Sequence, residues 1–185
     1  MIQTTREVNV SQLLASETLT GTWALDPSRS TAEFQVKYFW RAMTVKGAFH
    51  EMTGEATVGS DRTVTGRISF DARSLNTKNN QRDKHLRSAD FFDIEKHPNV
   101  VLTVTSAPAT GPTQLQLQGT FEAGGRVKPV TFTARVKEAS SQAAVLIATL
   151  ELNRSEFGMT WNPIHIASMT VRGVVEARFV RPWAS

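Results

Sequence analysis

Residues 31–39 read Thr-Ala-Glu-Phe-Gln-Val-Lys-Tyr-Phe, with apolar and polar side chains in alternation. The even-numbered residues from Ala32 to Tyr38 are apolar or aromatic, and the odd-numbered residues from Glu33 to Lys37 are polar. Successive side chains of an extended chain point to opposite faces. The stretch therefore predicts a β-strand with one face on a core and the other in water.

The same pattern recurs along the chain and predicts an all-β protein. Further strand-like stretches are Gly21–Asp26, Val45–Met52, Val64–Phe70, Val100–Thr105, Leu115–Phe121, Val130–Val136, Leu146–Leu152 and Met169–Phe179. Turn-forming residues separate them, and Gly124-Gly125 is expected to be a hairpin turn. About eight or nine strands joined by short polar turns indicate a sandwich or a closed antiparallel barrel.

Two regions lack the alternation. Residues 1–20 are expected to be an N-terminal extension ahead of a single domain at 21–183, with a helix over Val10–Glu17 capped by Ser11. Residues 79–93 predict a second short helix, because Asn79 or Asn80 can cap it and Asp83 suits its first turn. We expect this helix to close one end of a barrel, anchored by an ion pair between Arg82 and Asp83.

Composition narrows the function classes. The chain has 185 residues, 40% hydrophobic and 21% charged, which is typical of a soluble globular protein. It has no cysteine, which excludes disulfides and thiolate metal sites. The net charge of +4 is not gathered into a basic run, so no nucleic-acid partner is expected. No signal peptide or membrane span is evident, so we expect a cytoplasmic protein without stable membrane insertion.

Few side chains suggest catalysis. The region containing Asp83, His85, Asp90, Asp93 and His97 is rich in titratable groups. Asp83 and His85 would not share a helix face, and the usual helical zinc spacing is absent. Helix capping, turns and salt bridges are the favoured roles, and no catalytic residue, metal or cofactor is expected.

The inward-facing aromatic side chains leave two interpretations open. A small barrel can be filled by its own side chains or can hold one small ligand. Periodicity does not separate a packed core from a ligand cavity. The side chains expected to meet in one interior are Phe34, Tyr38, Phe49, Phe70, Phe121, Phe132 and Phe179.

Five motifs occur in an order that resembles the YceI-like family of polyisoprenoid-binding proteins. They are Trp23–Ser30, Val45–Phe49 with Gly54, Ser74–Thr77 with Arg82–Asp93, Val127–Val130, and Asn153–Met159. The resemblance runs from about residue 21 to 180 and implies a lipocalin-like, eight-stranded antiparallel barrel with a long apolar tunnel. Tyr38 departs from the family pattern, where this strand often ends in His.

The resemblance implies a non-enzymatic protein that binds or carries an isoprenoid or another long apolar lipid, of the polyprenyl phosphate or isoprenoid quinone type. The head group is expected to meet Arg82, His85 or Arg154. Two alternatives remain open: an enzyme that uses Asp83, His85 or Tyr38 on a small apolar substrate, and a solid barrel that serves as an interaction module. Barrels with exposed strands such as Val45–Met52 often pair, so a homodimer is a candidate assembly that the sequence leaves open. The expected tunnel lining is Phe34, Val36, Tyr38, Phe49, Phe70, Leu86, Phe91, Phe92, Phe121, Phe132, Phe157, Met159 and Phe179.

Overall fold

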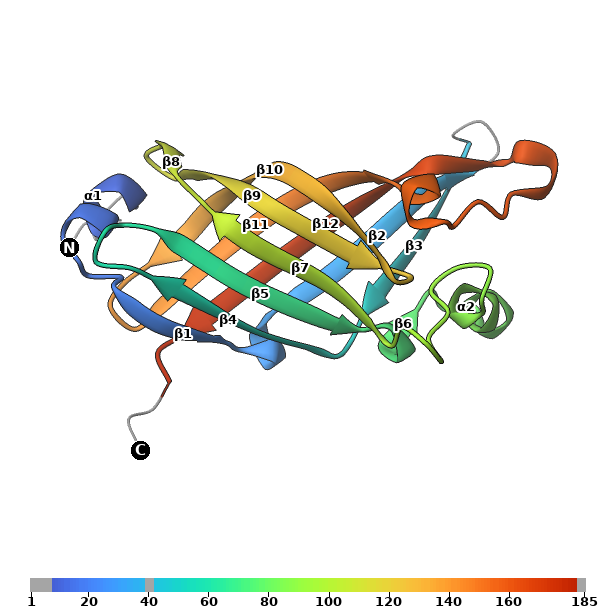
Figure 1. Ribbon diagram of the computed structural model, residues 1–185, viewed down its shortest axis with the longest axis horizontal. Helices are drawn as coiled ribbons and strands as arrows, with labels where there is room; N and C mark the ends of the chain where they lie inside the picture. The colour runs from blue at the N-terminus through green and yellow to red at the C-terminus, as the bar shows by residue number, and fades with distance from the viewer. Residues whose placement is uncertain (1–7, 39–41, 183–185) are drawn as a thin grey trace, which may run out of the picture.

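The computed structural model describes residues 8–38 and 42–182, and its strands form a closed eight-stranded antiparallel β-barrel (Figure 1). The predicted all-β, lipocalin-like barrel is thus confirmed. The strands are β1 Gly21–Leu25, β2 Thr31–Tyr38, β3 Met43–Phe49, β4 Met52–Val58, β5 Val64–Asp71, β6 Leu75–Asn76, β7 Asn99–Ser106, β8 Ala109–Gly111, β9 Gln114–Ala123, β10 Arg126–Ala139, β11 Ala143–Asn153 and β12 Ala167–Val180. The α-helices are α1 Val10–Ala15 and α2 Asn80–Arg87, and short 3-10 helices cover Pro27–Arg29, Ala72–Ser74, Arg154–Phe157 and Pro163–His165.

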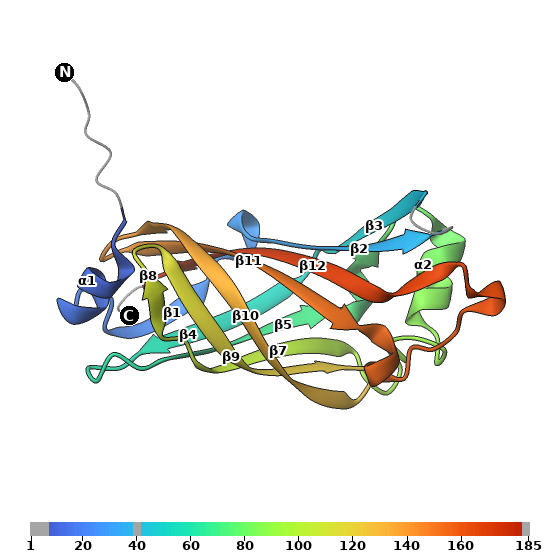
Figure 2. The same cartoon turned by 90° about the horizontal axis from the view of Figure 1, so that it is seen from above.

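The barrel closes where the first strand meets the last. The hydrogen-bonded order runs β1-β4-β5-β7-β9-β10-β11-β12, and β1 pairs with β12 at Ala24↔Val180 and Leu25↔Phe179. The rest of β12 pairs with β2, which pairs in turn with β3. The helices α1 and α2 lie at opposite ends of the barrel (Figures 1 and 2). The interior is therefore bounded by a different helical segment at each end.

The stretch predicted as one strand at Val45–Met52 is divided in the structure, so that prediction was wrong in its bounds. β3 ends at Phe49 and β4 begins at Met52. Between them, the backbone N–H groups of His50 and Glu51 donate to the Ser74 hydroxyl oxygen at 3.1 and 3.0 Å. These amides are therefore satisfied by a side chain instead of a neighbouring strand, which lets the chain bend here.

The segment expected as a helix over 79–93 is helical only as far as Arg87. The Asn79 side chain caps it by accepting from the Arg82 N–H, as predicted. Beyond Arg87 the chain folds back, and the N–H groups of Phe92 and Ile94 donate to the carbonyls of Leu86 and Arg87. Those carbonyls would otherwise be unpaired at the helix end, so the turn replaces the last helical hydrogen bonds.

The expected Arg82–Asp83 ion pair is not formed, because both side chains bind Thr77 instead. The buried Asp83 carboxylate accepts from the Thr77 N–H and hydroxyl. The Arg82 guanidinium donates to the Thr77 hydroxyl and carbonyl oxygens at 2.7 and 2.8 Å. The two charges thus attach α2 to the residue that follows β6, through a shared threonine.

The helix near the N-terminus also differs from its prediction. It ends at Ala15 instead of Glu17, and its cap is Asn9 instead of Ser11, because the Asn9 side chain accepts from the Gln12 N–H at 3.2 Å. Val10 and Leu14 are both buried. The helix is packed on the end of the barrel and is not a loose appendage.

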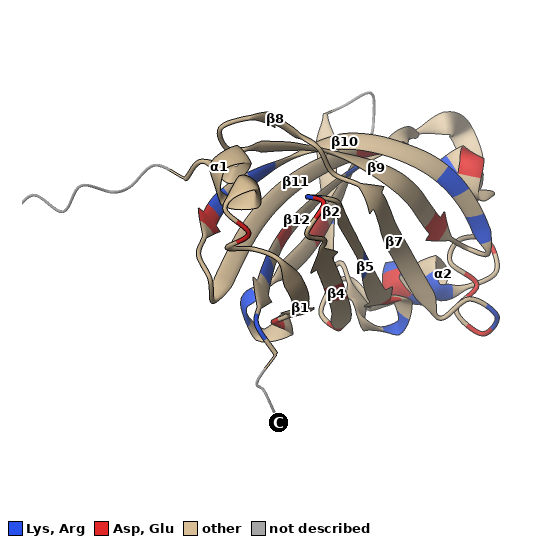
Figure 3. Cartoon of the chain, turned by 60° about the vertical axis from the view of Figure 1, so that its left-hand side comes forward, with Lys and Arg blue, Asp and Glu red and all other residues tan. Residues whose placement is uncertain are grey.

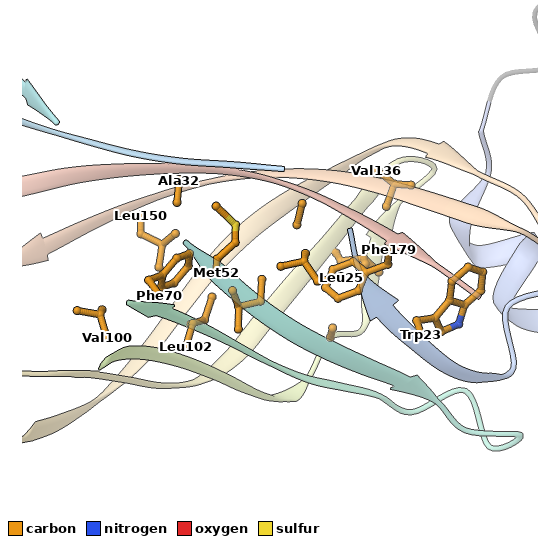
Figure 4. Close-up of a cluster of buried hydrophobic side chains, with 14 of the residues drawn as sticks. Trp23, Leu25, Ala32, Met52, Phe70, Val100, Leu102, Val136, Leu150 and Phe179 are labelled. Atoms are coloured by element: carbon orange, nitrogen blue, oxygen red, sulfur yellow. The ribbon is translucent and has the colours of Figure 1, made fainter. Parts of the chain in front are cut away.

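The core lies along the barrel axis. Figure 4 shows side chains from several strands turned into the interior, with Met52, Phe70 and Leu150 gathered in its middle part. Charged residues are scattered over the strands and turns (Figure 3). In the described part of the chain, no helix combines the length and apolar character that crossing a bilayer requires.

Candidate functional site

The interior holds two apolar chambers, one towards each helix. In each chamber the volume open to the centre of a water molecule is about 140 Å³. Roughly 10–15 Å³ by this measure suffices for one water, so both voids are large. The barrel is therefore not packed solid. The interaction-module alternative required a solid barrel, so this geometry disfavours it.

The chamber towards α2, here called the α2-end chamber, is lined by residues from several strands, from α2 and from the 91–92 and 154–159 segments. Eleven of the thirteen expected tunnel residues lie here, and whether they contact a ligand stays a prediction. Its lining is Ala32, Glu33, Phe34, Val36, Tyr38, Phe49, Phe70, Leu86, Phe91, Phe92, Val100, Phe121, Ala123, Leu150, Leu152, Arg154, Phe157, Met159, Val171, Gly173 and Val175.

The chamber towards α1, the α1-end chamber, is lined mostly by aliphatic side chains. Phe132 and Phe179, the other two expected tunnel residues, lie here. Val10 and Leu14 of α1 and Leu19 contribute from outside the barrel strands. Smaller side chains, including Ala134, Ala144 and Ala148, leave much of the space.

The two chambers meet at Leu150 and Val175, which line both. Leu150 is buried on β11, and Val175 lies on the neighbouring strand β12. The two chambers thus adjoin at one place along the barrel axis, and the single long tunnel implied by the resemblance stays a prediction. A molecule longer than one chamber would have to pass this boundary.

Arg154 is the buried cation of the α2-end chamber, with only 6% of its surface exposed. Its guanidinium donates to three backbone carbonyls: Nε to Ser168 at 3.1 Å, and Nη1 to Met159 and Trp161 at 2.6 and 3.1 Å. Nη2 is buried without a hydrogen-bond partner. The Phe91 ring centre lies 5.8 Å from the guanidinium carbon.

No carboxylate pairs with Arg154 in the part of the chain that the structure describes. Burial lowers the pKa of the guanidinium from its ordinary value, and the nearby Tyr38 acts in the opposite direction. Burying an unpaired cation is costly. The chamber therefore offers a guanidinium and a phenol hydroxyl to a ligand that carries oxygen acceptors.

The other two head-group candidates line neither chamber. Arg82 is bound to Thr77, as described above. His85 lies 3.0 Å from an Asp90 carboxylate oxygen and packs edge-on against Phe91 and Trp161, at 5.1 and 4.4 Å between ring centres. His85 thus supports the wall of the α2-end chamber from behind Phe91.

The three groups considered for catalysis are not brought together as one site. Asp83 is bound to Thr77, His85 is paired with Asp90, and Tyr38 lines the chamber. Over residues 8–38 and 42–182, no three His, Asp or Glu side chains are grouped as they would be around a metal ion. The arrangement of the chamber suits holding an apolar molecule.

Several residues of the site were not predicted. Leu150, Val175 and Gly173 line the chambers but carried no aromatic signal. Trp161 lines neither chamber and packs against His85 and Phe91 from a loop with no periodicity. Val10 and Leu14 were assigned to an extension outside the barrel. Their spacing of four residues on a helix indicates a common face, which is the one signal that pointed to a packing role.

The chain was compared with known proteins. The model of the YceI-like domain matches residues 23–179. A UPF0312 protein of Pseudomonas putida is 31% identical over 122 residues, covering 62% of this chain and 64% of that protein. A UPF0312 protein of Vibrio cholerae is 30% identical over 125 residues, covering 62% and 65%. These matches span a little under two thirds of each relative.

Solved structures share the fold at lower identity. BcnA of Burkholderia cenocepacia has a TM-score of 0.76 at 15% identity, covering 83% of this chain and 98% of that one. A structure described as a polyisoprenoid binding domain from Saccharophagus degradans, implicated in plant cell wall breakdown, has a TM-score of 0.70 at 14% identity, covering 86% and 98%. A Campylobacter jejuni YceI protein has a TM-score of 0.65 at 19% identity, covering 75% and 85%.

Proposed function

Because this chain belongs to the YceI-like family, we propose that it binds a long apolar lipid of the isoprenoid type and carries it without catalysing a reaction. The observation that carries the proposal is the α2-end chamber, an apolar cavity beside the buried and unpaired guanidinium of Arg154. The structural neighbour described as a polyisoprenoid binding domain supports the choice of ligand class.

The energetics of the chamber favour hydrocarbon. Burial of apolar groups contributes about 0.8 kcal/mol per CH₂, so a few isoprene units supply a large gross driving force. Ordering the chain and fixing its position offset part of that gain. A prenyl chain has no polar group along its length, so the shape of the chamber decides which chain fits.

The polar end of the ligand belongs beside Arg154 and Tyr38 in this proposal. A guanidinium donates to phosphate oxygens, and both groups can donate to a quinone carbonyl. Either head group would provide an acceptor in the part of the chamber where Nη2 of Arg154 lacks one. A quinone ligand, a transport role, a cytoplasmic location, homodimerisation and the boundaries at 20 and 183 stay predictions.

Gly173 provides the test. It lines the α2-end chamber, and the nearest atom to a Cβ added there is the Glu33 carbonyl oxygen at 3.9 Å. Gly173→Leu therefore fills the chamber without a backbone clash. Thr149→Leu, an exposed substitution on the adjacent strand β11, is the matched control.

Purified protein would be extracted with solvent and the extract examined by lipid mass spectrometry, followed by uptake of farnesyl and geranylgeranyl phosphate and a short-chain ubiquinone. We expect lipid with the unaltered chain and with Thr149→Leu, and at least a tenfold loss with Gly173→Leu because the side chain occupies the cavity. No co-purifying lipid and no uptake by the unaltered chain would overturn the proposal. Chemical conversion of an offered lipid would favour the enzyme alternative.

A further inference from the structure

The wall of the α1-end chamber is completed by residues that precede the family domain. The match to the YceI-like model begins at residue 23. Val10, Leu14 and Leu19 lie before it, line this chamber and are only 2%, 8% and 6% exposed. The end of the apolar interior is therefore built from a segment that the family pattern does not include.

This segment is held at several points. At its start, the Val10 N–H donates to the Pro112 carbonyl in the turn between β8 and β9, at 2.7 Å. At its other end, the Trp23 indole N–H donates to the Leu19 carbonyl at 2.8 Å. The hydrogen bonds fix residues 10–19 across the opening, so the helix is a defined wall of the chamber.

Arg181 adds a second connection from the other end of the chain. Its guanidinium donates to the carbonyls of Thr18 and Thr20, at 3.1 and 2.8 Å. It also lies 4.1 Å from the centre of a Trp23 ring, within the range of a cation–π contact. Residues 18–20 are thus tied to the strand end that closes the barrel.

We infer that Val10 and Leu14 form the end wall that sets the longest apolar chain the barrel accepts; this rests on the proposed function. A hydrocarbon chain whose head group lies near Arg154 extends away from α2, across the boundary at Leu150 and Val175, into the α1-end chamber. From Leu152 to Ala144 this path follows β11 for about 27 Å, at roughly 3.4 Å per residue. Beyond it, the side chains of α1 stop the chain.

The composition of the α1-end chamber fits a role in accepting the far end of a lipid. The cation in its lining is Arg67, which is exposed and not buried like Arg154, and its walls are mostly Val, Leu, Ile and Ala. Such a void has no buried charged group that would position a polar head group, and it accepts methylene and methyl groups equally. Each methylene that finds room changes affinity about fourfold, because about 0.8 kcal/mol corresponds to that ratio.

The test measures chain-length preference with the full-length protein. Farnesyl, geranylgeranyl and solanesyl phosphate compete in pairs for the protein, and native mass spectrometry gives the ratio bound. Leu14→Ala enlarges the end of the α1-end chamber, and Ala148→Leu reduces its volume from β11. Gln12→Ala, an exposed change on the same helix, is the matched control.

We expect Leu14→Ala to shift the ratio towards the longer chain by at least fourfold, Ala148→Leu to shift it towards the shorter chain, and Gln12→Ala to leave it unchanged. Hydrogen exchange at the Val10 amide shows whether α1 remains docked in each variant. If prenyl phosphates bind and neither Leu14→Ala nor Ala148→Leu moves the ratio, the end-wall inference is wrong and the proposed function stands. If the unaltered chain binds none of them, both fail.

Discussion

The two ends of the barrel differ in chemistry although the same strands build both. At the α2 end, Arg154 is buried among aromatic side chains beside Tyr38. At the α1 end, the walls are mostly aliphatic, and the lining includes no buried charged side chain. The interior is therefore polar at one end and apolar at the other. If the proposed function holds, we expect a molecule with one polar and one apolar end to bind with its polar end towards α2.

The rims differ as well. The loop near the α2 end exposes Trp161 and Ile164, at 48% and 78% of their surfaces. Ile164 and His165 have φ values of 59° and 52°, in the left-handed region that β-branched residues strongly disfavour. The α1 end instead tucks Val10 and Leu14 inwards under hydrogen bonds. The α2 end therefore carries a strained apolar loop on its outside, and the α1 end is covered by a packed helix.

The largest effect is expected at the boundary between the two chambers. Leu150 lines both chambers and is buried. We expect Leu150→Ala to merge them and to cost about 2–5 kcal/mol of unfolding free energy, as large-to-small core substitutions do. Urea unfolding measures the cost, and a crystal structure shows whether the voids join.

Leu152→Ala is the control for that change, because Leu152 lies on the same strand and lines the α2-end chamber alone. It should enlarge one chamber and leave the boundary in place. Equal destabilisation and two separate voids in both variants would show that Leu150 does not divide the interior.

Arg154 is the next test, because it makes the α2 end polar. Arg154→Met leaves the carbonyls of Met159, Trp161 and Ser168 without their donor. One unsatisfied buried group costs about 1–3 kcal/mol, and the bond to Met159 is buried while the other two are partly buried. We therefore expect a loss of at least that size together with weaker binding of prenyl phosphates. Thermal unfolding and native mass spectrometry measure the two effects.

Arg154→Lys keeps the charge but not the planar set of donors, so it should retain more binding than Arg154→Met. If Arg154→Met binds prenyl phosphates as tightly as the unaltered chain, the head group does not meet Arg154. The structural role of Arg154 in holding the 158–168 segment would then be its whole role.

Most of the barrel could be predicted from alternation, because a period of two gives a strand and its inward face. The pattern in β12 correctly placed Phe179 in the interior. It could not place Phe179 at one end and Phe34 at the other, because periodicity gives the face of a side chain and not its depth along the axis. The sequence therefore could not predict which of the two chambers an inward-facing side chain lines.

Interactions between distant segments account for the rest. The bend after β3 depends on the Ser74 hydroxyl, which lies 24 residues from His50 in the sequence. Arg154 was a candidate for the head group, but its three carbonyl partners come from the loop that follows it and from the start of β12. The apolar face of α1 was visible in the spacing of Val10 and Leu14, but the surface that it covers was not.

The smallest expected effect concerns the connection that keeps the α1 end closed. Arg181→Gln removes the hydrogen bonds to Thr18 and Thr20 and the contact with Trp23. We expect a local loss of about 1 kcal/mol, the usual net value of such a contact, and so about fivefold faster hydrogen exchange at the Val10 amide. Arg172→Gln, an exposed change on β12, should leave that exchange unchanged.

Because Val10 is bonded to Pro112 and not to Arg181, faster exchange there would show that residues 10–20 open as one unit. Unchanged exchange would show that Arg181 does not hold α1 in place, and that the apolar contacts of α1 and the hydrogen bond from Val10 to Pro112 do so without it.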